Sequence, residues 1–302
     1  MPTLVGRITS QTAGRLNFLL PELISTQKDQ LMRSEKVHST TEKETMLMTL
    51  YGRALQSRSK DPILQDKWAE DAVNRIDYDF GKLKMREHRA LLIAIRAKQL
   101  DLWTTRYLAD HPNATVLHLG CGLDSRIYRI DPPASVRWFD VDYPEVIELR
   151  RRLYPERAGY RMIGSSLADL GWLDEVPRDR PALIVAEGVT MYLTEDIMKP
   201  LLNRLTDHFP GGQIAFDAHS RQLVRWVAKT GTRVKGTGVS FGWGIDDPQD
   251  IKKLEPHLDL IAELRVPDLA AYSRMPWTMR ALARVMDSIP ALRRMRCLLY
   301  RF

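Results

Sequence analysis

A glycine turn between two apolar runs constrains the fold of this 302-residue chain more than any other feature. It lies in TVLHLGCGLDSRIYRIDPPASVRWFDVD, residues 115–142, where the first run enters Gly120-Cys121-Gly122 and the second ends in Asp140 and Asp142. Such runs suit buried parallel strands, and glycine permits turns and close approaches that a Cβ atom would prevent. A carboxylate about 20 residues beyond the glycines is where nucleotide-binding sheets bind ribose hydroxyls. The pattern predicts an α/β sheet that presents a nucleoside-bearing cofactor.

The residues after Gly122 discriminate between cofactors. A dinucleotide-binding turn has a third glycine three positions later, where the helix N-terminus holds a pyrophosphate, but this chain has Ser125 there. The negative charge of Asp124 disfavours a diphosphate and favours a ligand with a positive centre or a free ammonium. The cofactor indicated by the residues is therefore S-adenosylmethionine.

Helical periodicity dominates up to about residue 108, and strands then alternate with helices. Further strands are expected at residues 161–166, 181–186, 213–217, 258–266 and 294–302. One helix is expected to begin at Pro144, and another to be capped by Thr194 and ended by Pro210-Gly211-Gly212. The element count favours a doubly wound, Rossmann-like sheet of seven strands with the last strand antiparallel, the class I methyltransferase arrangement.

We expect residues 1–110 to form an N-terminal extension and helical cap, and residues 111–302 to form the cofactor-binding core. A segment around residues 225–250, rich in glycine, threonine and basic residues, is consistent with a lid over an acceptor pocket or with a plain loop. The first 25 residues faintly resemble a transit peptide, but a helix over residues 13–20 explains the same composition. A cytoplasmic protein is therefore expected.

Charge and cysteine content narrow the class of protein. The 45 basic residues exceed the 38 acidic ones and give a net charge of +7, but the two signs are interleaved. Short basic clusters such as residues 150–152 indicate solvated helix faces rather than a nucleic-acid track. Two cysteines, Cys121 and Cys297, support neither a disulfide framework nor a zinc cluster, and no metal is expected. No run approaches the roughly 20 apolar residues of a membrane span.

Three motifs occur in a fixed order and spacing: VLHLGCGLDSRIYRI, WFDVDYPEVIELRR and IVAEGVTMYL. Together they resemble the leucine carboxyl methyltransferase-like superfamily, and within it the bacterial O-methyltransferases related to the tetracenomycin polyketide enzyme. The likeness covers about residues 41–302 and includes MTLYGRALQSRSKDP and FGWGIDDP. The resemblance implies a class I, S-adenosylmethionine-dependent O-methyltransferase that acts on a carboxylate or phenolic hydroxyl of a small, polyketide-like metabolite.

The resemblance also implies roles for residues at the glycine turn and before it. Arg96 matches the arginine that binds the methionine carboxylate, a task suited to a guanidinium, although a surface helix arginine is the alternative. Gly120 and Gly122 match the glycines that cradle the cofactor. Asp142 matches the ribose-binding acid or caps the helix that follows, and Asp140 is either its partner or a buried support.

Later positions complete the implied cofactor site. Asp169 and Leu170 match the carboxylate and backbone amide that contact adenine, although an ordinary loop acid is nearly as well supported. Glu187 follows the apolar run PALIVA, where an unpaired acid is costly, so it should face a cation such as the cofactor ammonium. A partly solvated loop acid is the alternative at this position.

Two residues are candidates for the chemistry of transfer. Tyr192 either lines the methyl-transfer face or packs as an aromatic residue. A carboxylate acceptor needs no base, whereas a phenol, with a pKa near 10, would benefit from one, and His219 is the best-placed base unless it is structural. His118 is read as a core residue. Arg53, Arg58 and Lys60 either engage an acidic substrate or lie on a solvated surface.

Two other functions stay open on the sequence alone. Other branches of the superfamily methylate a protein C-terminus or a modified nucleotide, which would require an exposed groove with a coherent basic face. A non-catalytic protein that retains the cofactor fold is the third reading. The expected partner is a small-molecule acceptor, with no nucleic acid, and the sequence does not indicate an oligomeric state.

Overall fold

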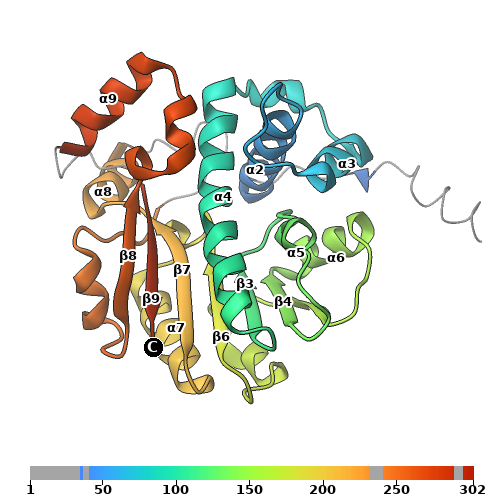
Figure 1. The fold of residues 1–302 in the computed structure, drawn as a ribbon, viewed down its shortest axis with the longest axis vertical. Helices are drawn as coiled ribbons and strands as arrows, with labels where there is room; N and C mark the ends of the chain where they lie inside the picture. Colours follow the sequence, from blue (N-terminus) through green and yellow to red (C-terminus); the bar gives the residue numbers. More distant parts are fainter. Residues whose placement is uncertain (1–34, 37–40, 231–240, 289–294) are drawn as a thin grey trace, which may run out of the picture.

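A single seven-stranded sheet organises the part of the chain that the computed structural model describes, residues 35–36, 41–230, 241–288 and 295–302 (Figure 1). Its strands are β3 Thr115–Leu119, β4 Arg137–Asp142, β5 Tyr160–Gly164, β6 Ala182–Ala186, β7 Gly212–Ala218, β8 Asp259–Arg265 and β9 Arg296–Arg301. The spatial order is β5-β4-β3-β6-β7-β9-β8, and β9 runs antiparallel to both of its neighbours while the other ladders are parallel. The predicted class I methyltransferase topology is confirmed.

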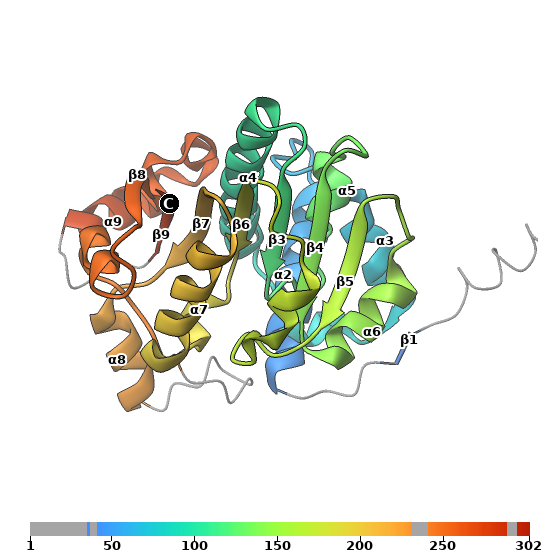
Figure 2. The same cartoon turned by 90° about the horizontal axis from the view of Figure 1, so that it is seen from below.

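Helices cover both faces of this sheet (Figure 2). They are α2 Thr41–Ser57, α3 Lys67–Arg75, α4 Glu87–Asp110, α5 Arg126–Ile130, α6 Pro144–Leu153, α7 Glu195–His208, α8 Arg221–Thr230 and α9 Trp277–Ser288. Neighbouring residues of a strand point to opposite faces, so Val116 packs in one core with Trp103 of α4, and Leu117 packs in another with Leu201 of α7. Burial on both faces explains why the central strands β3 and β6 are almost continuously apolar.

The position of β3 determines where a ligand can bind. It lies between β4 and β6, all three strands are parallel, and the chain crosses from one half of the sheet to the other at this strand. In open α/β sheets the crevice at the carboxyl ends of such strands is the ligand site. The Gly120-Cys121-Gly122 turn directly follows β3 and therefore lies at that crevice.

Helix boundaries largely follow the predicted signals. Pro144 is the first residue of α6, where its missing N–H group has no helical partner to lose. Thr194 occupies the predicted N-cap position of α7, but its side chain makes no hydrogen bond to the first turn of the helix. Gly212 is the first residue of β7. Only glycine fits at this position, because a Cβ atom would lie 2.0 Å from the carbonyl oxygen of Ala182.

Helix α4 connects the N-terminal helices to the sheet. The helix α4 packs against α2 and also supplies Leu100, Trp103 and Tyr107 to a sheet core, so it joins the predicted cap to the predicted core. The short strands β1 Glu35–Lys36 and β2 Ile76–Asp77 pair in parallel. The expected helix at 13–20 and the centre of the expected lid, 231–240, lie outside the described residues. The division at residue 110 stays a prediction.

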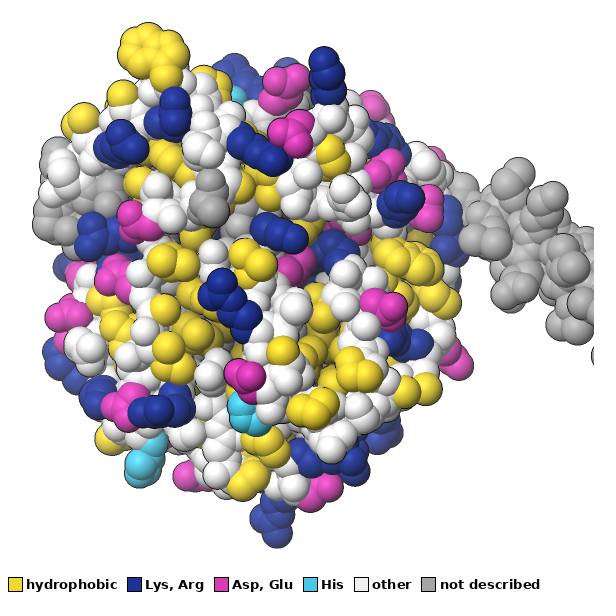
Figure 3. All heavy atoms as spheres, viewed as in Figure 1, with side chains coloured by type: hydrophobic (Ala, Val, Ile, Leu, Met, Phe, Trp, Pro, Cys, Tyr) yellow, Lys and Arg dark blue, Asp and Glu magenta, His cyan; other side chains and the backbone are white. Residues whose placement is uncertain are grey.

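The surface of the described residues shows no single dominant charge on the face drawn in Figure 3, where basic side chains alternate with acidic and hydrophobic ones. Among the described helices, none has the length and apolar character needed to cross a membrane.

Candidate cofactor and acceptor site

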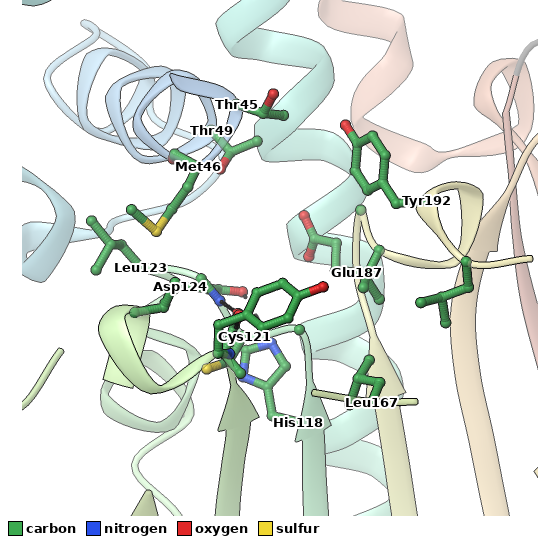
Figure 4. Close-up of a pocket in the computed structure, with 18 of the residues that line it drawn as sticks. Thr45, Met46, Thr49, His118, Cys121, Leu123, Asp124, Leu167, Glu187 and Tyr192 are labelled. Carbon is green, nitrogen blue, oxygen red and sulfur yellow. Dashed lines mark hydrogen bonds and ion pairs between the residues drawn. The ribbon is translucent and has the colours of Figure 1, made fainter. Parts of the chain in front are cut away.

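A cavity of about 450 Å³ lies at the carboxyl ends of β3, β4 and β6, beneath α2 (Figure 4). Thr45, Met46, Thr49 and Arg53 reach it from α2, and Arg96 reaches it from α4. Much of the remaining wall comes from the glycine turn, from Asp142, Tyr143, Glu145 and Val146 at the end of β4, and from residues 165–168 after β5. The cavity therefore collects residues from α2 and α4 and from the carboxyl ends of β3, β4, β5 and β6.

The glycine turn has the backbone conformation that its sequence predicts. Gly120 and Gly122 have φ angles of +58° and +49°, in the left-handed region that favours glycine. A Cβ atom on Gly120 would lie 2.5 Å from Cγ2 of Val189, whereas one on Gly122 would face Met46 at 3.4 Å. Gly120 is thus required by packing, and Gly122 leaves backbone exposed to the cavity.

Asp142 is joined to the glycine turn by a hydrogen bond. Its Oδ2 accepts from the N–H of Gly122 at 2.7 Å, and its Oδ1 accepts from the N–H of Tyr143 at the same distance. Burial raises the pKa of Asp142, and these two backbone donors oppose the shift. The N-cap position of α6 belongs to Tyr143, so Asp142 lies one residue before it and lines the cavity.

Asp140 has the burial and the partners that a supporting residue would have. It is fully buried, accepts from Trp138 Nε1 at 2.8 Å and Tyr160 OH at 2.5 Å, and pairs with Arg150. Burial alone would raise its pKa, but Arg150 and the hydrogen bonds outweigh burial and lower the pKa to about 2. Asp140 is not among the residues that line the cavity.

Arg150 corrects the prediction of a solvated basic face at residues 150–152. Arg151 and Arg152 are exposed, but Arg150 is fully buried, and its Nη1 donates to the carbonyl oxygens of Gly122 and Asp124 at 2.8 and 2.9 Å. Three consecutive arginines point in different directions around a helix, and only one of them reaches the glycine turn. Arg150 therefore connects Asp140 to the turn and holds the turn in place.

Arg96 and Glu187 meet at the other end of the cavity. Arg96 Nε donates to Glu187 Oε1 at 3.0 Å, and its Nη1 donates to Asp217 Oδ2 at 3.1 Å. Asp217 also accepts from the N–H of Gly188 at 2.6 Å, which fixes the carboxylate relative to the strand ends. Sequence reasoning missed Asp217, a buried acid at the end of β7 whose position resembles that of Glu187 after β6.

A buried ionic cluster supports this end of the cavity. Its members are the arginines 53, 96, 126 and 129 and the acids Asp66, Asp101, Asp124, Glu187 and Asp217. Arg53 is buried and donates to the carbonyl oxygen of Leu123 at 3.0 Å, whereas Arg58 and Lys60 are exposed. Of the three basic residues predicted near the site, only Arg53 lines the cavity.

Asp169 and Leu170 do not line the cavity. Asp169 is exposed, and its Oδ1 accepts from the N–H of Gly171 at 3.1 Å, the arrangement of an ordinary helix-capping acid. The four residues before it, 165–168, form the wall instead. The role predicted for Asp169 and Leu170 at adenine therefore stays a prediction that the geometry does not support directly.

Tyr192 and His219 are linked by an aromatic ring. Tyr192 lines the cavity, and its ring packs edge-on against Phe241 with centroids 5.6 Å apart. The His219 ring stacks on the Phe241 ring with centroids 5.7 Å apart, and His219 is not among the residues that line the cavity. Burial raises the pKa of Tyr192, and the charge of Arg96 opposes the shift. Tyr192 is therefore a neutral phenol at pH 7, able to donate a hydrogen bond.

Three other titratable groups near the site, His118, Cys121 and Cys297, have buried side chains. His118 is buried within β3 and lines the cavity floor, with Nδ1 3.2 Å from Asp140 Oδ1. Cys121 and Cys297 are buried free thiols, and burial raises the pKa of each. Within the described ranges, no group of three or more His, Cys, Asp or Glu side chains could hold a metal ion.

The chemistry of the cavity fits S-adenosylmethionine. The exposed glycine backbone and Asp142 suit a ribose, and Nη2 of Arg96, which makes no hydrogen bond with a described residue, suits a carboxylate. Gly188, with φ +68°, leaves room for that nitrogen, because a Cβ atom there would lie 3.2 Å from it. Donors and acceptors for both ends of the cofactor are therefore present in one cavity.

Comparison with known proteins agrees with this geometry. The family described as leucine carboxyl methyltransferase matches residues 46–206, more than half of the chain. The chain belongs to the leucine carboxyl methyltransferase family. The chain is also similar to the tetracenomycin polyketide synthesis O-methyltransferase TcmP of Streptomyces glaucescens, with 49% identity over 224 residues, 74% of this chain and 83% of TcmP.

A second relative extends the match. The S-adenosyl-L-methionine-dependent methyltransferase dpfgK of Gibberella zeae is 36% identical over 275 residues, 83% of this chain and 92% of its own length. The predicted family, its S-adenosylmethionine cofactor and its O-methyltransferase class are confirmed by these matches. A crystal structure of a DUF574 family protein from Streptomyces avermitilis shares the fold, with TM-score 0.55 and 14% identity over 85% of this chain and 96% of that one.

Proposed function

We propose that this member of the leucine carboxyl methyltransferase family methylates an oxygen of a small, planar acceptor, with a carboxylate as the preferred nucleophile and a phenolic hydroxyl as the alternative. The observation that carries the proposal is the single cavity that joins Asp142 and the glycine turn to Arg96 and then opens beneath α2 and Tyr192. Such a cavity can align a cofactor and a nucleophile and exclude water, which is what in-line methyl transfer requires.

Each end of the cavity has a proposed role. Asp142 accepts hydrogen bonds from the ribose hydroxyls. Each of its carboxylate oxygens has one backbone donor and keeps a lone pair for a second hydrogen bond. Arg96 donates to the methionine carboxylate through Nη2. Adenine lies against residues 165–168. When bound, the cofactor supplies an electrophilic methyl group on a sulfonium.

The acceptor side supports a planar ligand with an ionised oxygen. Tyr192 lines the cavity, its ring packs against Phe241, and Phe241 stacks on His219. An aromatic ring in the cavity wall, held in place by such packing, can pack against an aromatic acceptor. Tyr192 can donate to the acceptor but cannot serve as a base, since its pKa is raised. His219 is not among the residues that line the cavity, so it does not supply a base at the cavity wall. A carboxylate, which is ionised at neutral pH, needs none.

The name of the relative TcmP points in the same direction, since tetracenomycin synthesis involves a polyketide. A polyketide-like acceptor for this chain is part of the proposal. The cytoplasmic location expected from the sequence stays a prediction.

Matched acceptors test the proposal. Naphthoic and anthracene carboxylic acids and the corresponding naphthols and anthrols are incubated with the protein and methyl-labelled cofactor, and methyl esters and ethers are separated by mass spectrometry. We expect ester formation and little ether formation. Ether formation alone would contradict the carboxylate assignment, and no product from either series, with intact cofactor binding, would contradict a planar aromatic acceptor.

A further inference from the structure

Exposed hydrophobic side chains gather at one end of the sheet, which is called the β8 end below and consists of α8, β8 and α9. Among the described residues seven large hydrophobic side chains are exposed, and five of them belong to this end: Trp226, Ile261, Trp277, Leu282 and Val285. The strand β8 forms the edge of the sheet, and both helices lie at that edge in Figure 1 and in Figure 2. Single exposed hydrophobic residues are ordinary, but a concentration of them marks an interaction surface.

The helix α9 has hydrophobic side chains on two faces. Met279 and Ala283, four residues apart, pack against a buried cluster that includes residues of α4. Trp277 and Val285 point away from this cluster and are 73% and 61% exposed, and Leu282 beside them is 58% exposed. Residues four apart share one face of a helix, so these two sets belong to different faces. The packing of α9 within the fold therefore does not explain its outward hydrophobic side chains.

Basic side chains accompany the hydrophobic ones at the β8 end. Arg284 is exposed beside Val285 on α9, and Arg225 and Lys229 are exposed on the helix α8, which also carries Trp226. The sequence of α8 contains no acid, and that of α9 contains one acid against two arginines. On the face drawn in Figure 3, hydrophobic and basic side chains lie together over α9. The partner that this charge attracts is negatively charged.

A negatively charged bilayer fits these residues better than a protein does. A stable protein interface buries about 800 Å² on each partner, around a core that is depleted of charged residues. At the β8 end the exposed hydrophobic side chains are divided among three elements, and basic side chains lie between them. A second copy of the chain would bring the same basic helices together, and like charges repel. Tryptophan and leucine beside lysine and arginine are typical of helices that lie in the membrane interface.

We propose that the β8 end binds the surface of a negatively charged bilayer. Trp277, Leu282 and Val285 enter the headgroup region, and the basic side chains of α8 and α9 lie against the lipid phosphates. This binding is peripheral, because α9 has only 12 residues and lies along the membrane surface rather than across the bilayer. The inference does not depend on the identity of the cofactor or of the acceptor.

Sedimentation with vesicles tests the proposal. The full chain is mixed with vesicles of phosphatidylcholine alone and with vesicles of equal parts of phosphatidylcholine and phosphatidylglycerol, and the bound fraction is measured. We expect the affinity for the negatively charged vesicles to be at least about 10-fold higher, since each basic side chain near such a surface contributes. High salt should weaken the binding, because it screens these charges.

Two variants of α9 locate the contact, and two variants of α4 serve as matched controls. The double substitution Trp277→Ser, Val285→Ser and the charge reversal Arg284→Glu should each weaken binding to the negatively charged vesicles by about 10-fold or more. Leu102→Ser removes an exposed hydrophobic side chain from α4, and Arg106→Glu makes the same charge change there. Both controls should bind nearly as well as the wild type. Circular dichroism checks that every variant keeps the fold.

Three results would overturn the proposal. The first is a wild-type protein that does not bind the negatively charged vesicles, and the second is an equal loss of binding in the α4 controls, which would indicate general charge attraction. The third is self-association of the wild type in lipid-free solution that the Trp277→Ser, Val285→Ser variant abolishes, measured by sedimentation equilibrium. That result would assign the surface to a second copy of the chain.

Discussion

At the scale of single residues, buried arginines determine the shape of the site. Arg150 holds the glycine turn from below, Arg53 holds it from α2, and Arg96 is oriented by Asp217 and Glu187. Composition does not reveal that these arginines are buried, because an arginine in a helix is usually solvated. The sequence identified Arg96 and Asp142 through motif likeness, but Arg150 and Asp217 became recognisable only when the strand ends were assembled. No local pattern distinguishes Arg150 from the two arginines after it.

Arg150→Leu should destabilise the protein strongly. The substitution leaves Asp140 buried without its counter-ion and removes two bonds to the turn, so the free energy of unfolding should fall by about 3–5 kcal/mol. Urea denaturation followed by circular dichroism measures the change. Arg151→Leu is the matched control: Arg151 and Glu148 are 52% and 59% exposed, and their pair should contribute less than about 1 kcal/mol. Equal effects of the two substitutions would contradict the role given to Arg150.

At the scale of elements, the turn between β3 and α5 has more backbone and packing constraints than the strands that flank it. The central strands β3 and β6 were predictable because each is a short apolar run buried on both faces, and the observed bounds of the predicted strands lie within two residues of the expected ones. The wall after β5 was not predictable in the same way. Whether residues 165–168 or Asp169 face the cavity depends on the path of a loop. Hydrophobic periodicity predicts the faces of helices and strands but not the path of a loop.

The two glycines of the turn should differ in their tolerance of alanine. Both positions have positive φ, which should cost about 1–2 kcal/mol in each variant. Gly120→Ala also places a methyl group 2.5 Å from Val189, and such overpacking should cost a further 1–3 kcal/mol or so, whereas Gly122→Ala meets only Met46 at 3.4 Å. Denaturation of both variants in parallel measures the difference. Equal losses would mean that Val189 moves aside at little cost.

At the scale of the whole molecule, the class I methyltransferase sheet brings strand ends from residues 119, 142, 164 and 186 to one edge, and α2 closes that edge. The order of the strands was inferred from their number and is confirmed by the observed pairing, including the antiparallel β9. How α2 and α4 pack was not predictable from periodicity, because amphipathic helices can dock in several ways. The cap nevertheless decides the size of the cavity and the position of the acceptor.

Calorimetric titration of S-adenosylhomocysteine, with NAD in parallel and Asp142→Ala as the control variant, tests the central claim most directly. We predict one binding site per chain for S-adenosylhomocysteine, an affinity at least about 10-fold weaker in Asp142→Ala, and no binding of NAD, because Asp124 and Ser125 disfavour a pyrophosphate. A preference for NAD, or S-adenosylhomocysteine binding that the Asp142 substitution leaves unchanged, would contradict the assignment of this cavity as the cofactor site.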